Sequence, residues 1–128
     1  MKIILLSGKQ NSGKTYAIRK LFEELTENGQ KHILSQEKLD DEREREAVVE
    51  YKNKKIAICS YGDYLWVCVE KIIEYTNCDV LILAYRDKFA IKLNKIVADN
   101  AHHCVIKKKK PNESDRKRVR KDILAAIG

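Results

Sequence analysis

The sequence predicts an α/β protein with three layers, in which a mostly parallel sheet with one antiparallel hairpin strand has helices on both faces. Three observations support this fold class. Short apolar runs alternate along the chain with longer segments whose apolar residues recur at helical spacing. The apolar runs are continuous, which is typical of strands buried on both faces. The 128 residues, without internal repeats or low-complexity linkers, fit a single domain, residues 1–128.

The first strand and the first helix are the clearest elements. Residues 2–6 form a continuous apolar run that ends at Ser7-Gly8, and a helix is predicted over residues 14–28. Glycine tolerates the left-handed conformation at a helix end, so Asn28-Gly29 is the expected stop. The apolar residues of this helix form one stripe: Ala17, Ile18, Leu21, Phe22 and Leu25.

The middle of the chain predicts a polar segment, a hairpin and a second helix. Residues 35–46 are dense in acid and base and are expected to be a surface segment. Residues 47–51 and 55–59 are strand-like, and the short polar gap between them indicates an antiparallel hairpin. A helix is predicted over residues 64–75. It is apolar over more than half its girth, and one face is expected to carry Leu65, Val69, Ile72 and Ile73.

The remaining elements continue the alternation of strand and helix. Residues 80–84 predict a central strand, residues 88–99 a helix, and residues 104–106 a last strand. A final helix follows Pro111, with Asn112 or Ser114 as its N-cap. The residues expected on the inner faces of these two helices are Phe89, Leu93, Ile96, Val97, Val119, Ile123 and Ile127.

The segment between the first strand and the first helix matches the pattern G-x-x-x-x-G-K-[ST]. A loop that wraps a phosphate closely has no room for side chains where it turns, and Gly8 and Gly13 meet that need. Lys14 is expected to reach the β- and γ-phosphates and to be exposed without ligand, while the Thr15 hydroxyl holds Mg²⁺. The predicted nucleotide-binding residues are Gly8, Lys9, Gln10, Asn11, Ser12, Gly13, Lys14, Thr15 and Tyr16.

Over residues 1 to about 29, this strand, loop and helix resemble the opening of the P-loop NTPase superfamily. The resemblance implies nucleotide-dependent chemistry and an acidic residue, at the end of another buried strand, that orders the magnesium. In that pattern an aspartate directly follows four apolar residues. Here Ser60 follows the apolar run, and the first acid is Asp63. Asp63 is the candidate metal residue, with helix N-capping as its alternative role, and Ser60 could touch the same metal-bound water.

Arg86 follows the central strand at the edge of the sheet where ligands of open α/β folds bind. It is expected to contact phosphate, or alternatively to pair with Asp87. ATP is favoured over GTP, because the guanine-specific pattern N-K-x-D is not met at Asn94-Lys95-Ile96-Val97.

The sequence therefore predicts Mg²⁺-dependent binding of a nucleoside triphosphate, with hydrolysis or phosphate transfer by an NTPase or small-molecule kinase. Lys14, Asp63 and Arg86, or an arginine of the C-terminal segment, are the expected catalytic residues. The alternative is a nucleotide-binding switch module with little turnover.

The net charge of +7 is concentrated in the C-terminal segment, residues 107–128. Nine basic and two acidic residues lie between Lys107 and Lys121, a local balance of 9 − 2 = +7. This stretch is expected to bind a polyanion or nucleic acid, or alternatively to be a solvated helix face. It contains no aromatic residue, so base stacking is not expected there.

No apolar run approaches the ~20 residues of a membrane span, so no membrane is expected as a partner and the cytoplasm is the expected location. Cys59 and Cys68 lie inside apolar segments and are expected to be core residues. The oligomeric state stays open.

Overall fold

The computed structural model describes residues 1–8, 13–26, 33–36, 46–60, 64–98, 103–107 and 112–128, and its strands form one six-stranded sheet in the order β2-β3-β4-β5-β1-β6. Four neighbouring strands are parallel: β4 (Lys54–Cys59), β5 (Val80–Arg86), β1 (Lys2–Gly8) and β6 (His103–Lys107). Beyond β4 the sheet continues through two antiparallel pairings: β3 (Glu46–Tyr51) and β2 (Ile33–Gln36).

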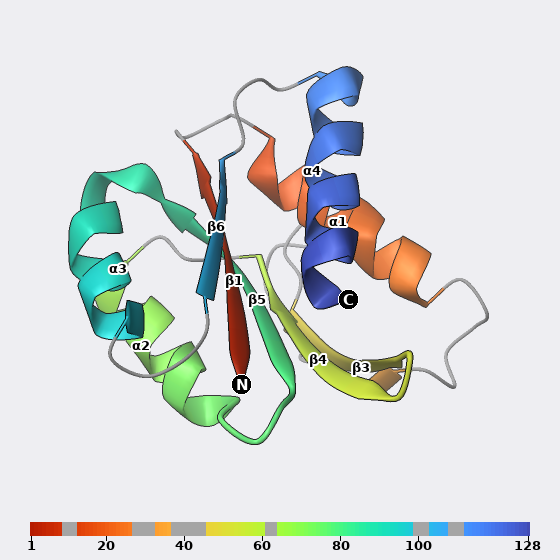
Figure 1. Cartoon of the computed structure of the whole chain (residues 1–128), viewed down its shortest axis with the longest axis horizontal. Helices are drawn as coiled ribbons and strands as arrows, with labels where there is room; N and C mark the ends of the chain where they lie inside the picture. Colours follow the sequence, from red (N-terminus) through yellow and green to blue (C-terminus); the bar gives the residue numbers. More distant parts are fainter. Residues whose placement is uncertain (9–12, 27–32, 37–45, 61–63, 99–102, 108–111) are drawn as a thin grey trace.

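Helices cover both faces of this sheet (Figure 1). One face carries α1 (Lys14–Leu25) and α4 (Glu113–Ile127). The other carries α2 (Leu65–Glu74) and α3 (Ala90–Ala98), the latter preceded by the short 3₁₀ turn η2 (Asp87–Phe89). The predicted α/β class, with a mostly parallel sheet, is confirmed.

The sheet separates two apolar cores. Successive side chains of a strand point to opposite faces, so β1 sends Ile4 and Leu6 toward α1 and α4, and Ile3 and Leu5 toward α2 and α3. All four side chains are fully buried. This double burial explains why the strand reads as a continuous apolar run in the sequence.

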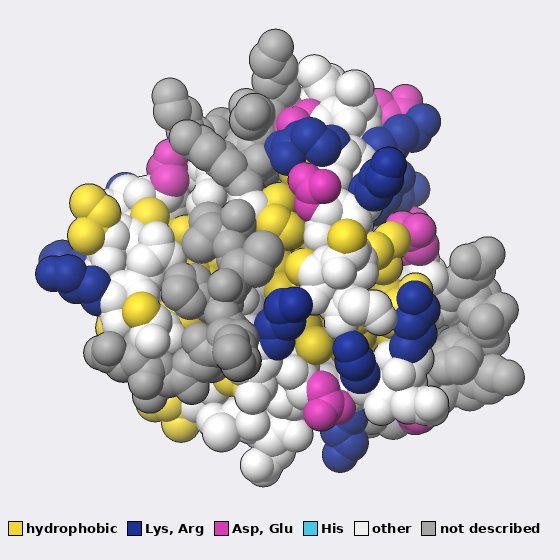
Figure 2. Space-filling view, viewed as in Figure 1, with side chains coloured by type: hydrophobic (Ala, Val, Ile, Leu, Met, Phe, Trp, Pro, Cys, Tyr) yellow, Lys and Arg dark blue, Asp and Glu magenta, His cyan; other side chains and the backbone are white. Residues whose placement is uncertain are grey.

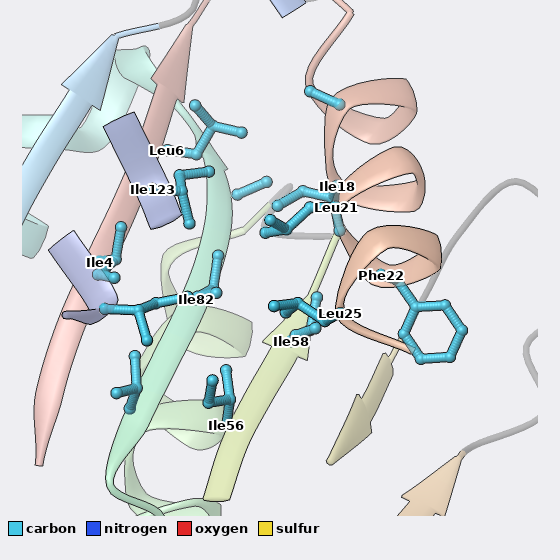
Figure 3. Packing of buried hydrophobic residues seen from close by; sticks show 14 of the residues in the cluster. Ile4, Leu6, Ile18, Leu21, Phe22, Leu25, Ile56, Ile58, Ile82 and Ile123 are labelled. Carbon is cyan, nitrogen blue, oxygen red and sulfur yellow. The ribbon is translucent and has the colours of Figure 1, made fainter. Parts of the chain in front are cut away.

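The helix stripes predicted for this face are buried. In Figure 3, Ile18 and Leu21 of α1 point toward the sheet, and Ile123 of α4 belongs to the same buried cluster as Ile82 of β5. Val119 and Ile127 complete the inner face of α4. The C-terminal helix is therefore part of the hydrophobic core.

The predicted hairpin is confirmed, and its turn is shorter than the polar gap suggested. Tyr51 pairs with Lys54, which leaves Lys52 and Asn53 as the turn, both with positive φ (51° and 63°). Two such residues are typical of a type I′ turn, whose twist matches that of the flanking strands.

Most of the predicted polar surface segment, residues 37–45, lies outside the described residues, and the described ends of the segment belong to strands. Residues 33–36 form β2, and Glu46 begins β3 with only 1% of its surface exposed. The sequence did not predict β2, because a four-residue strand is too short to show a period. It did not predict the burial of Glu46, because the ion pair with Lys71 joins residues distant in sequence.

The inner face of α2 also differs from the expectation. Cys68 is fully buried, whereas Ile73, predicted to face inward, is 69% exposed. The helix is apolar around most of its girth, so the periodicity could not select one face. Within the described residues no helix has both the length and the apolar character needed to cross a membrane.

Candidate functional site

The candidate site lies at the carboxyl ends of β1 and β5. These strands are adjacent and parallel, yet the chain leaves β1 for α1 on one face and leaves β5 for α3 on the other. Connections that diverge in this way open a crevice beyond the strand ends, and ligands of open α/β sheets bind in such crevices. Topology therefore selects the end of β1, which is also where the glycine-rich segment begins (Figure 1).

The two ends of the glycine-rich segment meet in the structure. The Lys14 ammonium donates a hydrogen bond to the Gly8 carbonyl, with 2.8 Å between Nζ and O. Gly13 adopts a left-handed conformation (φ 91°, ψ 19°), which an L-residue with a side chain rarely adopts, immediately before α1. Lys9, Gln10, Asn11 and Ser12 lie outside the described residues. Lys14 is half-buried and not exposed as expected, because its side chain folds back over the start of the loop.

The N-terminus of α1 offers backbone donors to an anion. The first N–H groups of a helix have no acceptor within the helix, and the N-cap residue, Gly13, has no side chain to supply one. The first turn of α1 also contains no acidic residue. The positive end of the helix dipole is thus not balanced by a carboxylate from its own first turn.

The N-terminus of α4 shows the opposite arrangement. The Asn112 side chain accepts a hydrogen bond from the Asp115 N–H at 2.9 Å, and Glu113 and Asp115 place two carboxylates in the first turn. This helix start is satisfied by its own residues. Among the described residues, α1 therefore begins without the side-chain cap and first-turn carboxylates that α4 has.

Cationic residues flank the end of β1 on both neighbouring strands. Arg86, the last residue of β5, is the register partner of Gly8, and Lys107, the last residue of β6, is the partner of Ser7. Neighbouring strands lie about 4.8 Å apart, so both backbone positions are adjacent to the loop. The register thus brings Arg86, a predicted site residue, next to Gly8.

Tyr16, one residue beyond Thr15, lies in a cluster of cations. The guanidinium of Arg116, from α4, is 4.2 Å from the centre of the Tyr16 ring. Arg19 and Lys20 of α1 lie at 5.4 and 5.5 Å from it. The sequence did not single out Arg116 from the other arginines of its segment, because its contact with Tyr16 depends on how α4 packs against α1.

Two of the residues named in the metal-binding prediction, Thr15 and Ser60, lie within the described residues. Thr15 lies in the first turn of α1 and is half-buried, and Ser60 is 5% exposed just beyond β4. Asp63 lies outside the described residues, so its role stays a prediction. In the described part of the chain, no three His, Cys, Asp or Glu residues are grouped as metal ligands. A single hydroxyl ligand is compatible with Mg²⁺, which usually keeps several waters and takes substrate phosphates as ligands.

Cys59 ends β4 at this same edge of the sheet. Burial raises the pKa of its thiol well above the ordinary value, and the nearby Glu46 carboxylate raises it further. The thiolate is the form that binds metals and attacks electrophiles. Cys59 is therefore a core residue, as the sequence predicted, and the same holds for buried Cys68.

A buried ionic cluster joins β3 to α2. Lys71 Nζ lies 2.8 Å from Glu46 Oε1, and the Tyr75 hydroxyl donates to Glu46 Oε2 at 2.7 Å. Lys71 also pairs with Glu74 at 2.9 Å. Burial and the hydrogen bond to Glu46 raise the pKa of Tyr75. Glu46, which the sequence did not single out, therefore links β3 to α2 through Lys71 and Tyr75.

Comparisons with models of known protein families, with curated proteins and with solved structures find no match to this chain. Functional inference consequently depends on the site itself.

Proposed function

We propose that this protein binds a nucleoside triphosphate, with ATP favoured over GTP, together with Mg²⁺ at Gly8–Thr15, and that it hydrolyses the nucleotide or transfers its phosphate. The observation that carries the proposal is the contact between Lys14 and the Gly8 carbonyl, made where a helix with glycine as its N-cap residue begins at the divergence of β1 and β5. A P-loop NTPase-like arrangement is proposed on the same grounds.

The charges near the loop suit a polyphosphate. The Lys14 ammonium is hydrogen-bonded to the Gly8 carbonyl, and Arg86 is in register with Gly8. The backbone amides that open α1 add donors and the positive end of a dipole. An incoming phosphate would exchange the Gly8 carbonyl for a charged acceptor, and charge-assisted hydrogen bonds of this kind are about twice as strong as neutral ones.

Magnesium would be held by the Thr15 hydroxyl and, through water, by Asp63 or Ser60. When bound, the ion neutralises charge on the phosphates. The chain's own contribution is to position the phosphates with the loop amides and to stabilise developing charge with Lys14 and Arg86. Arg116, held beside Tyr16, is a second arginine candidate for that role.

The binding proposal is tested by thermal unfolding with Mg²⁺ and ATP, GTP or ADP. A ligand at one hundred times its dissociation constant stabilises the fold by roughly 2.7 kcal/mol. We expect a shift for wild type that is lost in Lys14→Ala, with an unchanged circular dichroism spectrum. Lys92→Ala, an exposed lysine of α3, is the matched control and should retain the shift. A Lys14→Ala protein that keeps the full shift would contradict the proposal.

Turnover is tested separately, because binding without turnover would favour the alternative, a switch module. In a single-turnover assay with Mg-ATP we expect phosphate release that Lys14→Ala abolishes. Binding without release over hours would exclude the hydrolase, and an acceptor screen would then test for the kinase.

A further inference from the structure

The layer formed by α2 and α3 exposes several large apolar side chains. Tyr64, Trp66, Ile73 and Ile91 are 60%, 66%, 69% and 78% exposed, and the rings of Tyr64 and Trp66 stack with centroids 6.3 Å apart. Single exposed apolar residues are ordinary, but three on two helices in contact, together with Tyr64 at the N-cap of α2, mark a candidate interface. Figure 2 shows hydrophobic and basic side chains together at the left edge, over α3.

The exposed faces of the two helices carry matching patterns with opposite charge. On α2, Trp66, Glu70 and Ile73 follow the spacing i, i+4, i+7, which places them on one face. On α3, Ile91, Lys95 and Ala98 follow the same spacing. All six residues are exposed. Each helix therefore presents an apolar, a charged and an apolar position in that order, with an acid on α2 and a base on α3.

The surrounding charges extend this complementarity. The α2 residues Glu70, Lys71 and Glu74 sum to −1, from one basic and two acidic residues. Residues 87–98 contain one acidic residue, Asp87, and three lysines, so their net charge is +2. A surface that holds both an acidic and a basic half, each beside exposed apolar groups, is complementary to a copy of itself turned by a two-fold rotation.

We infer that this surface binds a second copy of the chain. In the resulting two-fold dimer, α2 of one protomer packs on α3 of its partner, so Glu70 meets the partner's Lys95 and Trp66 is covered. The rotation repeats each contact, so two Glu–Lys pairs form. A different protein would need its own surface with the complementary charges and apolar groups, whereas a second copy of this chain already has them. The interface lies on the layer opposite α1 and α4 and does not depend on nucleotide binding.

The two helices are short, so the interface falls at the small end of specific interfaces and a dissociation constant in the micromolar range is expected. Trp66 is the only tryptophan, which makes its fluorescence a direct probe of the surface. Sedimentation from roughly 1 µM to 1 mM should show dimers at high concentration. The Trp66 emission should shift to shorter wavelength over the same range.

Charge reversal tests the pairing. Glu70→Lys alone would place lysine against lysine twice, and Lys95→Glu alone would place glutamate against glutamate twice. We expect each variant to self-associate at least about tenfold more weakly than wild type. A mixture of the two variants would restore two opposite-charge pairs in a heterodimer. The mixture should therefore associate where neither variant does by itself.

Matched controls are Glu50→Lys on β3 and Lys121→Glu on α4, which reverse exposed charges away from this surface and should leave association unchanged. Circular dichroism checks that each variant is folded. Three results would overturn the inference: a wild-type protein that stays monomeric throughout, a Glu70→Lys protein that dimerises like wild type, or a mixture that stays monomeric. The first would mean that a different molecule covers the surface.

Discussion

At the scale of single residues, the loop combines a backbone requirement with a charge. Gly13 has a φ of 91°, where only glycine is unstrained, and Lys14 follows directly. The motif supplies both features within two residues, so the proposed phosphate binding would depend on the backbone conformation at Gly13. A change at Gly13 should consequently affect both the stability of the fold and nucleotide binding.

We predict that Gly13→Ala lowers the free energy of unfolding by about 1–2 kcal/mol, because a Cβ is disfavoured in the left-handed region. Urea denaturation measures the change. Nucleotide-dependent stabilisation should fall as well, since the first amides of α1 would be re-aimed. Ser114→Ala, an exposed position in α4, is the control and should stay within about 0.5 kcal/mol of wild type.

The two arginine candidates can be separated by their kinetics. Arg86 is in register with Gly8, whereas Arg116 approaches through the Tyr16 ring. We predict that Arg86→Ala lowers the rate of single-turnover phosphate release by at least about tenfold and weakens nucleotide affinity by less. This difference is expected for a group that stabilises transition-state charge. Equal losses in affinity and rate would instead assign Arg86 to ground-state binding.

At the scale of elements, the attachment of α2 to the sheet depends on a buried ion pair. The Glu46 side chain is 1% exposed and that of Lys71 13% exposed, so removal of the lysine would take this cation away from a buried carboxylate. We predict that Lys71→Met costs about 3–5 kcal/mol of stability in urea denaturation. Lys20→Met, which removes the exposed pair with Glu23, should cost at most about 1 kcal/mol. Similar losses in both variants would show that the buried pair has no special role.

Cys59, at the end of β4, should make the free energy of unfolding fall in alkaline solution. The pKa of Cys59 is raised in the fold, so the folded protein keeps the proton that the unfolded chain releases above about pH 8.5. Stability is therefore fully present below that pH and is lost as pH rises toward the folded pKa. Urea denaturation between about pH 7.5 and 10 should show this loss, and Cys59→Ala should show a smaller one. An identical pH dependence in the variant would contradict the assignment.

At the scale of the whole molecule, the basic C-terminal segment has a structural role as well as a charge. Val119, Ile123 and Ile127 are buried, so deletion of α4 would open the core. Several of its charges are paired: Arg118 with Asp115 and Asp122, and Arg120 with Glu24. In Figure 2 acidic side chains lie among the basic ones over α4. These pairs favour the solvated-face interpretation, while polyanion binding at Lys107–Lys121 stays a prediction.

Substitution, and not truncation, is the appropriate test of that binding. If the segment binds single-stranded nucleic acid, Lys117→Glu with Lys121→Glu should reduce the salt slope of affinity by roughly 1.4, at about 0.7 for each phosphate that the protein no longer neutralises. Lys52→Glu with Lys55→Glu, in and beside the β3–β4 turn, is the control. Salt-independent binding, or no binding, would contradict the prediction.

The sequence by itself predicted most of the strands, all four helices and the position of the glycine-rich segment. These features depend on contacts between near neighbours, such as the apolar stripe of α1 or the glycine before Lys14, and periodicity reports them directly. The short strand β2 was missed because four residues carry too little periodicity.

Only the tertiary structure decided which distant residues meet. The register that brings Arg86 beside Gly8, the packing that brings Arg116 to Tyr16, and the burial of Glu46 against Lys71 all join segments far apart in the chain. It also decided which face of α2 stays exposed. The physical reason is the same in each case: strand pairing and helix packing are set by the energy of the whole core, and no local pattern records them.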